Sequence, residues 1–222
     1  LVMQERGFLD GSRMANVFNM MRPRDLIWPY VVNNYMLGRK PFPFDLLYWN
    51  ADSTRMPAAM HSFYLRNMYL NNLLREPGGI TLCDTPIDLS TVKTPLYFIS
   101  TIEDHIAPWK TVYAGSRVFS GSNVRFVLGG SGHIAGIVNP PAANKYGYWT
   151  NEKLVDDAEA WLADAKQHPG SWWTDWQQWV DKHGGGKVAA RTLGAGKLKA
   201  LEDAPGSYVR VRLESAAKKK VR

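Results

Sequence analysis

Two short apolar runs, residues 96–99 and 125–128, stand out in the middle of the chain. Both are rich in β-branched or aromatic residues and both end in turn residues, which is typical of buried strands. The segment between them begins at Pro108, ends at Gly121 and carries apolar residues at helical spacing. Strand, helix and strand in about thirty residues predict a βαβ unit, whose crossover makes the two strands parallel.

Each predicted strand is followed by a loop with a side chain suited to catalysis. Asp104 follows the first strand, and His133 lies in a Gly-Ser-Gly-His sequence after the second. Neighbouring strands lie roughly 4.8 Å apart, and reactive groups collect beyond their carboxyl ends, so we expect these two side chains to meet. A carboxylate there can hold one imidazole nitrogen and leave the other to take a proton from a nucleophile.

Both residues also have a structural interpretation. His133 could be an ordinary surface-loop histidine, and Asp104 could cap the next helix. An acid that precedes a histidine is the chain order of α/β-hydrolase triads, in which the nucleophile comes first, and this order favours catalysis. His105 would point away from its neighbour, and we expect a structural role for it.

The first third of the chain has a different pattern. Residues 12–21, 25–37 and 60–74 show helical spacing, and the apolar density of 25–37 predicts a largely buried segment. Methionine and aromatic residues are frequent here, and strand signals are sparse. We interpret residues 1–77 as a helical cap over an active site; the alternative is an all-helical subdomain that packs without gating.

The remainder of the chain contains weaker signals. Residues 80–83 are a strand candidate before a turn at 84–89, and 154–165 predict a helix. Ser171 could cap a last helix, in which Trp172, Trp176 and Trp179 share one face. Packing onto the core explains that stripe better than sugar stacking or contact with a membrane-like surface. We therefore expect a core part at 78–183 and a basic, flexible tail at 184–222, with 207–212 extended.

Composition narrows the classes of function. The chain has 222 residues, 45% of them hydrophobic, but no apolar run approaches the ~20 residues of a membrane span. It shows no signal peptide, and its single cysteine suits a reducing compartment. The net charge of +7 comes from residues 184–222, which hold ten Lys and Arg against three Asp and Glu. A basic nucleic-acid-binding face on the folded part is therefore not expected.

No residue of this chain has the setting of a nucleophile. Cys83 lacks the flanking glycines of a strand-to-helix elbow, and no serine has the elbow's spacing. The five histidines form no His-x-x-x-His pair, and no phosphate-binding glycine loop occurs, so we expect no metal and no cofactor. Because the chain starts at Leu1, we interpret it as part of a longer protein whose nucleophile lies upstream.

Several motifs resemble the class I polyhydroxyalkanoate synthases. The two most specific are the loops at residues 103–109 and 131–141. Further similarity lies at 44–50, 64–67 and 170–173, and the resemblance covers nearly all of the chain from Gly11 to Arg212. It implies the C-terminal part of such a synthase, with an α/β-hydrolase fold: a partial core with a mainly parallel sheet, and a helical cap subdomain.

The resemblance also implies an activity, an acyltransferase that builds polyester from 3-hydroxyacyl-CoA through a Cys-Asp-His triad. His133 would be the general base, and Asp104 would orient it or help to activate the substrate's 3-hydroxyl group. The cap would gate substrate entry and contribute to a homodimer, and the protein would work in the cytoplasm at the surface of polymer granules. The rivals are another α/β-hydrolase, such as an esterase or depolymerase, and a granule-binding module made of the tryptophan-rich end and the tail.

Overall fold

The structure of the chain, a computed structural model, describes residues 2–21, 23–41, 43 and 54–210. It divides into two compact units, Leu1–Thr174 and Asp175–Arg222. The boundaries expected at residues 77/78 and 183/184 stay predictions. The motif at 44–50 lies outside the described residues. None of the described helices combines the length and apolar character that a membrane crossing needs.

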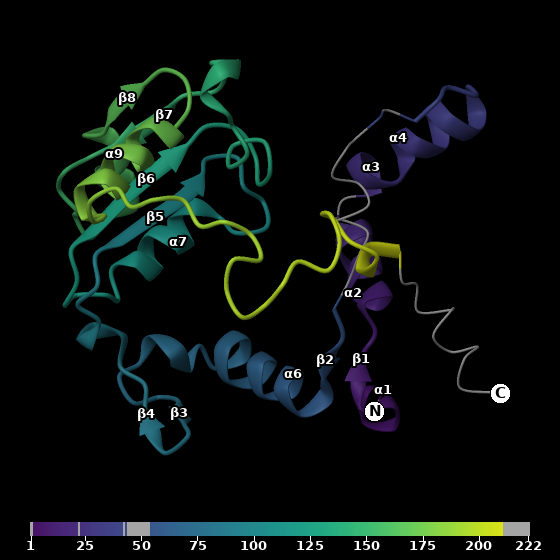
Figure 1. Cartoon of the computed structure of the whole chain (residues 1–222), viewed down its shortest axis with the longest axis horizontal. Coiled ribbons are helices and arrows are strands. Elements are labelled where there is room, and N and C mark those ends of the chain that lie inside the picture. Colours follow the sequence, from purple (N-terminus) through teal and green to yellow (C-terminus); the bar gives the residue numbers. More distant parts are fainter. Residues whose placement is uncertain (1, 22, 42, 44–53, 211–222) are drawn as a thin grey trace. The chain divides into compact units, whose positions relative to one another are not determined.

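The first unit contains a four-stranded sheet with the order β5-β6-β7-β8 (Figure 1). Its strands are β5 (Leu96–Thr101), β6 (Val124–Gly129), β7 (Tyr148–Thr150) and β8 (Lys166–His168). The pair β5–β6 is parallel and is joined by α7 (Trp109–Ser116), which confirms the predicted βαβ unit, although the helix ends before Gly121. An α/β architecture is therefore present.

The expectation of a mainly parallel sheet is wrong for the described residues. The pairs β6–β7 and β7–β8 are both antiparallel. The first residue of β7, Tyr148, pairs with Gly129, the last residue of β6, so β7 runs back along β6. The connection between β6 and β7 contains only the three-residue 3-10 helix η5 (Pro141–Ala143), which is much shorter than the crossover that a parallel connection needs.

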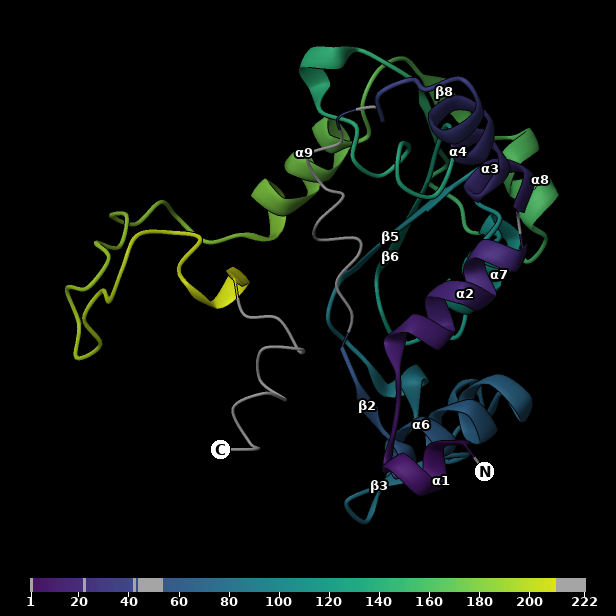
Figure 2. The same ribbon diagram turned by 90° about the vertical axis from the view of Figure 1, so that its right-hand side faces the viewer.

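The two faces of the sheet bury separate apolar clusters, because successive strand residues point to opposite faces. On one face, Phe126 and Leu128 of β6 pack against Tyr113 of α7 and Trp161 of α8 (Ala158–Ala163). Figure 2 shows α7 and α8 on the same side of β5 and β6. On the other face, Val127 packs with Tyr148 and Trp172. Helix α8 is shorter than the predicted helix at 154–165 and begins at the N-cap Asp157.

The first part of the chain is mostly helical, as expected. Its elements are α1 (Val2–Arg6), β1 (Phe8–Leu9), α2 (Gly11–Met21), α3 (Pro23–Leu26), α4 (Trp28–Tyr30), the π-helix η1 (Val31–Met36), β2 (Met56–Pro57), α6 (Ala58–Tyr64), the π-helix η2 (Leu65–Leu70) and the 3-10 helix η3 (Leu73–Arg75). The predicted helix at 12–21 is confirmed by α2. The antiparallel pair β1–β2 was not predicted, since two-residue strands leave no periodic signal.

The prediction that residues 25–37 are largely buried is wrong in this structure. Trp28 is 57% exposed and Tyr35 is 86% exposed, and no residue of α3, α4 or η1 is buried. Periodicity and apolar density show that a segment can be covered, but they do not show what covers it.

A small hairpin precedes the sheet. The strands β3 (Thr81–Leu82) and β4 (Thr85–Pro86) pair antiparallel, so the predicted strand at 80–83 is shorter and the predicted turn contains a strand. Cys83 and Asp84 connect them with φ angles of 48° and 61°, which is the backbone of a two-residue type I′ turn. The 3-10 helix η4 (Leu89–Thr91) follows.

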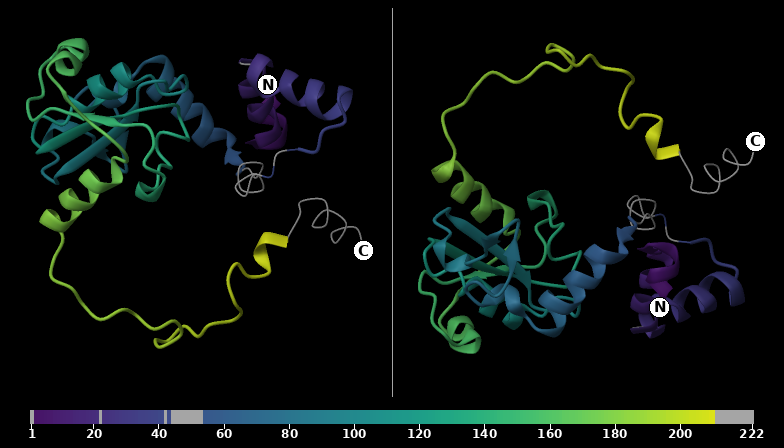
Figure 3. Two further views of the ribbon diagram at one scale, coloured as in Figure 1. Left: turned by 90° about the horizontal axis from the view of Figure 1, so that it is seen from above. Right: turned by 90° about the horizontal axis from the view of Figure 1, so that it is seen from below.

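Helix α9 (Trp173–His183) leads into the second unit. The Ser171 hydroxyl accepts a hydrogen bond from the Trp173 N–H at 3.1 Å, in agreement with the predicted cap. After α9 the described chain has no strand and no helix until the 3-10 helix η6 (Tyr208–Arg210), as Figure 3 shows. The extended segment predicted at 207–212 is therefore wrong where it is described.

Candidate functional site: a carboxylate and an imidazole beyond a parallel strand pair

The loop after β5, residues 102–107, holds Asp104 (the acid loop). One carboxylate oxygen, Oδ1, accepts hydrogen bonds from the backbone N–H groups of Ile106 and Ala107, both at 2.9 Å. This is the geometry of an aspartate that ties its own loop. The side chain is 7% exposed, so the carboxylate is fixed in position below the surface.

The loop after β6, residues 130–139, holds His133 (the histidine loop). Ser131 has a φ of 68°, which is uncommon for a residue other than glycine and turns the chain sharply after the strand. The Gly136 N–H donates to the Gly132 carbonyl at 2.9 Å, and the Val138 N–H donates to the Ile134 carbonyl at 2.8 Å. These bonds form a compact turn around His133.

The parallel register brings the two loops together. It pairs Thr101 with Gly129, and the Ile102 N–H then donates to the Gly129 carbonyl at 2.9 Å. The Glu103 N–H donates to the Ser131 carbonyl at 3.1 Å. The two segments thus stay bonded for two residues past the strands, to Glu103, which precedes Asp104, and to Ser131, two residues before His133.

The two predicted side chains meet. His133 Nδ1 lies 2.8 Å from Asp104 Oδ2. An ionised carboxylate only accepts hydrogen bonds, so Nδ1 carries a proton, and in the neutral imidazole Nε2 is then the nitrogen with the free lone pair. The His133 side chain is 43% exposed, so this second nitrogen is accessible to a reacting group.

The environment keeps Asp104 ionised. Burial raises the pKa of this carboxyl, but the hydrogen bonds from the Ala107 N–H, from His133 and from the Ile106 N–H together outweigh it and lower the pKa below its ordinary value. The carboxylate is therefore charged near neutral pH and suited to hold the imidazole, and it is a weak base toward any other group.

Sequence reasoning missed three residues that support the histidine loop. Trp172 Nε1 donates to the Gly136 carbonyl at 3.0 Å, and Trp173 Nε1 donates to the Ile137 carbonyl at 2.9 Å. Gly136 itself has no space for a side chain, because a Cβ would lie 2.3 Å from the Gly130 carbonyl oxygen. The sequence shows only that Trp172 and Trp173 lie near the start of a helix. It does not indicate that their indoles bond the histidine loop.

The other candidates are not part of the site. Cys83 is exposed in the β3–β4 turn, and His105 is exposed beside Asp104. His168 Nε2 lies 2.8 Å from the Thr150 hydroxyl, and its ring stacks on Tyr148 in the sheet. His61 is buried against the Met3 sulfur.

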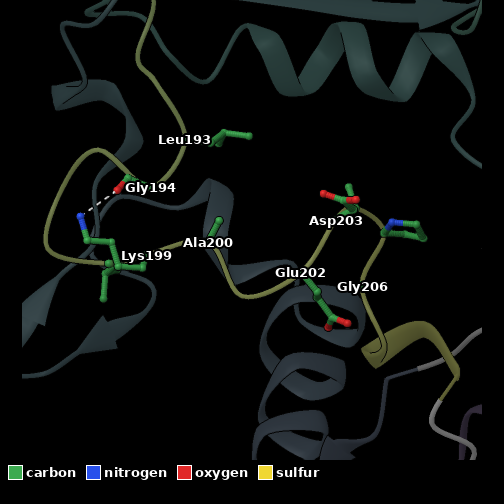
Figure 4. A pocket seen from close by; sticks show the side chains of 10 residues that line it. Leu193, Gly194, Lys199, Ala200, Glu202, Asp203 and Gly206 are labelled. Atoms are coloured by element: carbon green, nitrogen blue, oxygen red, sulfur yellow. Dashed lines mark hydrogen bonds between the residues drawn. The ribbon is translucent and has the colours of Figure 1, made fainter.

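Outside this site, the described residues show neither a metal site nor a reactive pair in the tail. Among the described residues, no three His, Cys, Asp or Glu side chains gather as a metal site requires. The tail forms an open hollow between Leu193 and Gly206, shown in Figure 4. There Glu202 accepts two bonds from Ser207, and these lower the pKa of its carboxyl. These contacts shape the tail and place no reactive pair in the hollow.

Comparison with known proteins gives a consistent result. The chain is 57% identical to the poly(3-hydroxyalkanoate) polymerase subunit PhaC of Rhizobium meliloti, over 95% of its own length and 34% of that protein. It is 54% identical to the poly(3-hydroxyalkanoate) polymerase of Methylorubrum extorquens, over 95% of the chain and 34% of that protein. It is 47% identical to the PhaC subunit of Cupriavidus necator, over 92% of the chain and 35% of that protein. The chain thus spans about a third of the length of these relatives. No protein-family model matches it.

Proposed function

Because the chain belongs to the family of poly(3-hydroxyalkanoate) polymerases, we propose that it supplies the acid and the general base of an enzyme that joins 3-hydroxyacyl units from coenzyme A thioesters into polyester. The observation that carries the proposal is the 2.8 Å contact between His133 Nδ1 and Asp104 Oδ2, with the imidazole accessible and the carboxylate buried. The acyltransferase would be complete only with a nucleophile from outside this chain.

The chemistry follows from the free nitrogen of His133. Nε2 takes the proton of a cysteine thiol, and the resulting thiolate attacks the thioester carbonyl. The coenzyme A sulfur leaves and takes the proton back from the imidazolium, so that an acyl-enzyme remains. The 3-hydroxyl oxygen of a second unit, deprotonated by the same imidazole, then attacks this acyl group and frees the cysteine sulfur.

Two roles were open for Asp104, and its contacts favour one of them. All described hydrogen bonds of its side chain go to the acid loop and to His133, and its lowered pKa makes it a poor acceptor for a hydroxyl proton. These features support the orientation of His133 rather than direct activation of the substrate's 3-hydroxyl group. The charge of Asp104 also stabilises the imidazolium as it forms.

We further propose an α/β-hydrolase fold for the catalytic core. The supporting features are the parallel pair β5–β6, the position of both residues beyond its carboxyl ends, and the order of acid before histidine. The helical residues 1–77 would form the cap, and their exposed apolar side chains, such as Trp28 and Tyr35, suit a segment that is covered in the whole enzyme. Homodimer formation, a cytoplasmic location and binding to the granule surface stay predictions from the resemblance.

Neither rival gains support. The relatives are named polymerases, not esterases or depolymerases. A granule-binding surface at the tryptophan-rich end is less well supported, because the indole N–H groups of Trp172 and Trp173 donate to the histidine loop.

The test measures coenzyme A release from 3-hydroxybutyryl-CoA by the full-length polymerase. We expect His133→Ala and Asp104→Asn each to lower the rate by at least ~10²-fold, the scale of a lost general base. Asp104→Asn keeps an oxygen that can accept from Ile106 and Ala107, so the loop is preserved while the charge is lost. Cys83→Ala serves as the control and should keep the activity. Near-normal turnover in either site variant would refute the assignment.

A further inference from the structure

Two adjacent tryptophans lie beside the histidine loop, on the sheet face opposite α7. The described bonds of their indole N–H groups both go to that loop: Trp172 donates to the Gly136 carbonyl and Trp173 to the Ile137 carbonyl. Consecutive carbonyls of the loop thus receive consecutive indoles. This arrangement fixes the backbone directly after the turn that contains His133.

The loop is confined from its other side as well. The position of a Cβ at Gly136 would be 2.4 Å from Thr101 Cγ2 and 2.3 Å from the Gly130 carbonyl oxygen. The Gly136 peptide therefore lies directly against β5 and the start of its own loop, while Trp172 holds its carbonyl. A shift of this peptide toward the sheet is blocked, and a shift away from it breaks the indole bond.

The indoles are themselves held by the core. Trp172 is buried and packs with Val127 and Tyr148, and its ring lies 6.1 Å from the ring of Tyr97. Ser171, which caps α9, is also buried. A rigid chain of contacts thus runs from the sheet through the two indoles to the turn around His133.

We propose that Trp172 and Trp173 are positioning residues, which hold the histidine loop so that His133 Nδ1 faces Asp104 and Nε2 faces the reacting group. The proposal rests on the proposed function for its catalytic meaning. Its structural part stands apart from it, because the state of the imidazole can be measured in this chain without turnover.

The experiment replaces each indole by a ring of similar shape without the N–H. Trp172→Phe and Trp173→Phe each remove one bond to the loop. Trp161→Phe is the matched control: Trp161 is fully buried in the cluster on the other face, and the described residues offer its indole N–H no hydrogen-bond partner. It therefore removes buried indole area from the core without removing a hydrogen bond to the histidine loop.

The readout is the pair of ¹⁵N chemical shifts of the His133 imidazole, which report which ring nitrogen carries the proton. In the unchanged chain and in Trp161→Phe we expect Nδ1 to be protonated. In Trp172→Phe and Trp173→Phe we expect the Nδ1-protonated form to lose ground to the Nε2-protonated form. In the full-length polymerase the same two variants should lower kcat by about tenfold or more with little change in KM, since misplaced reacting groups cost rate rather than binding.

Unchanged imidazole shifts in both Trp172→Phe and Trp173→Phe would overturn the proposal. So would a change of equal size in Trp161→Phe, because it would trace the effect to a loosened core. If Trp172→Phe fails to fold, the half-buried Trp173 provides the deciding comparison. Failure of both to fold also contradicts the proposal, which assigns these bonds to the loop rather than to the stability of the unit. Failure of the proposed function would show differently, as normal turnover in His133→Ala.

Discussion

Gly136→Ala is the sharpest perturbation of the histidine loop. The added methyl group would lie 2.3 Å from the Gly130 carbonyl oxygen, 2.4 Å from Thr101 Cγ2 and 3.0 Å from the Gly132 carbonyl oxygen. Two of these three atoms are backbone, so no side-chain rotation can make the space. The loop must move, and any movement stretches the bond between Trp172 and the Gly136 carbonyl.

The expected cost can be worked out from these contacts. Overpacking by one methyl group costs about 1–3 kcal/mol, and a weakened hydrogen bond adds about 0.5–1.5 kcal/mol. Alanine also lowers the conformational entropy of the unfolded chain, which offsets about 0.4–1 kcal/mol of this loss. We therefore expect Gly136→Ala to lower the free energy of unfolding by about 0.5–4 kcal/mol.

Gly132→Ala is the control in the same loop. The nearest atom to its new methyl group is the Glu103 carbonyl oxygen at 4.0 Å, so we expect a change within about 0.5 kcal/mol or a slight stabilisation. Urea unfolding followed by near-ultraviolet circular dichroism gives both free energies. Combining Gly136→Ala with Thr101→Ser should recover part of the loss, because serine lacks the Cγ2 methyl group that the new alanine would meet. Equal stability of the two alanine variants would refute the reasoning about the loop's packing.

Two further predictions concern Asp104 and the start of α8. Because the folded-state pKa of Asp104 is lowered, its contribution to stability is present above the ordinary carboxyl pKa and is lost as the pH falls through the lowered value. Asp104→Asn should therefore flatten the dependence of the urea midpoint on pH in that acidic range, and an unchanged slope would contradict the assignment. Asp157→Ala removes the side chain that accepts from the Ala160 N–H and should cost about 1 kcal/mol of unfolding free energy. Asp156→Ala, which breaks only an exposed ion pair with Arg117, should cost less than about 0.5 kcal/mol, and equal losses would refute the cap.

The βαβ unit and the contact of Asp104 with His133 could be predicted because both depend on short-range signals. Apolar runs bounded by turn residues define β5 and β6, and parallel pairing then brings their carboxyl ends together. The contact between Asp104 and His133, which follow the two strands, could therefore be predicted without further information.

The missed features depend on tertiary contacts. Strand β8 reads Lys-Gln-His and has no apolar pattern; it forms because it pairs with β7, where Thr150 bonds His168. The bonds from Trp172 and Trp173 join residues 36 positions apart, and no local pattern indicates them. The prediction that residues 25–37 are buried was wrong for the opposite reason. Their apolar density is visible in the sequence, but the surface that would cover them is not.

The tautomer of His133 in the intact chain tests the central claim most directly. The ¹⁵N shifts of its imidazole, measured near neutral pH, should show a protonated Nδ1 and an Nε2 with a free lone pair, and Asp104→Asn should remove this preference. A predominantly Nε2-protonated ring in the unchanged chain, or shifts that Asp104→Asn leaves as they were, would contradict the account of a carboxylate that prepares this histidine as a base.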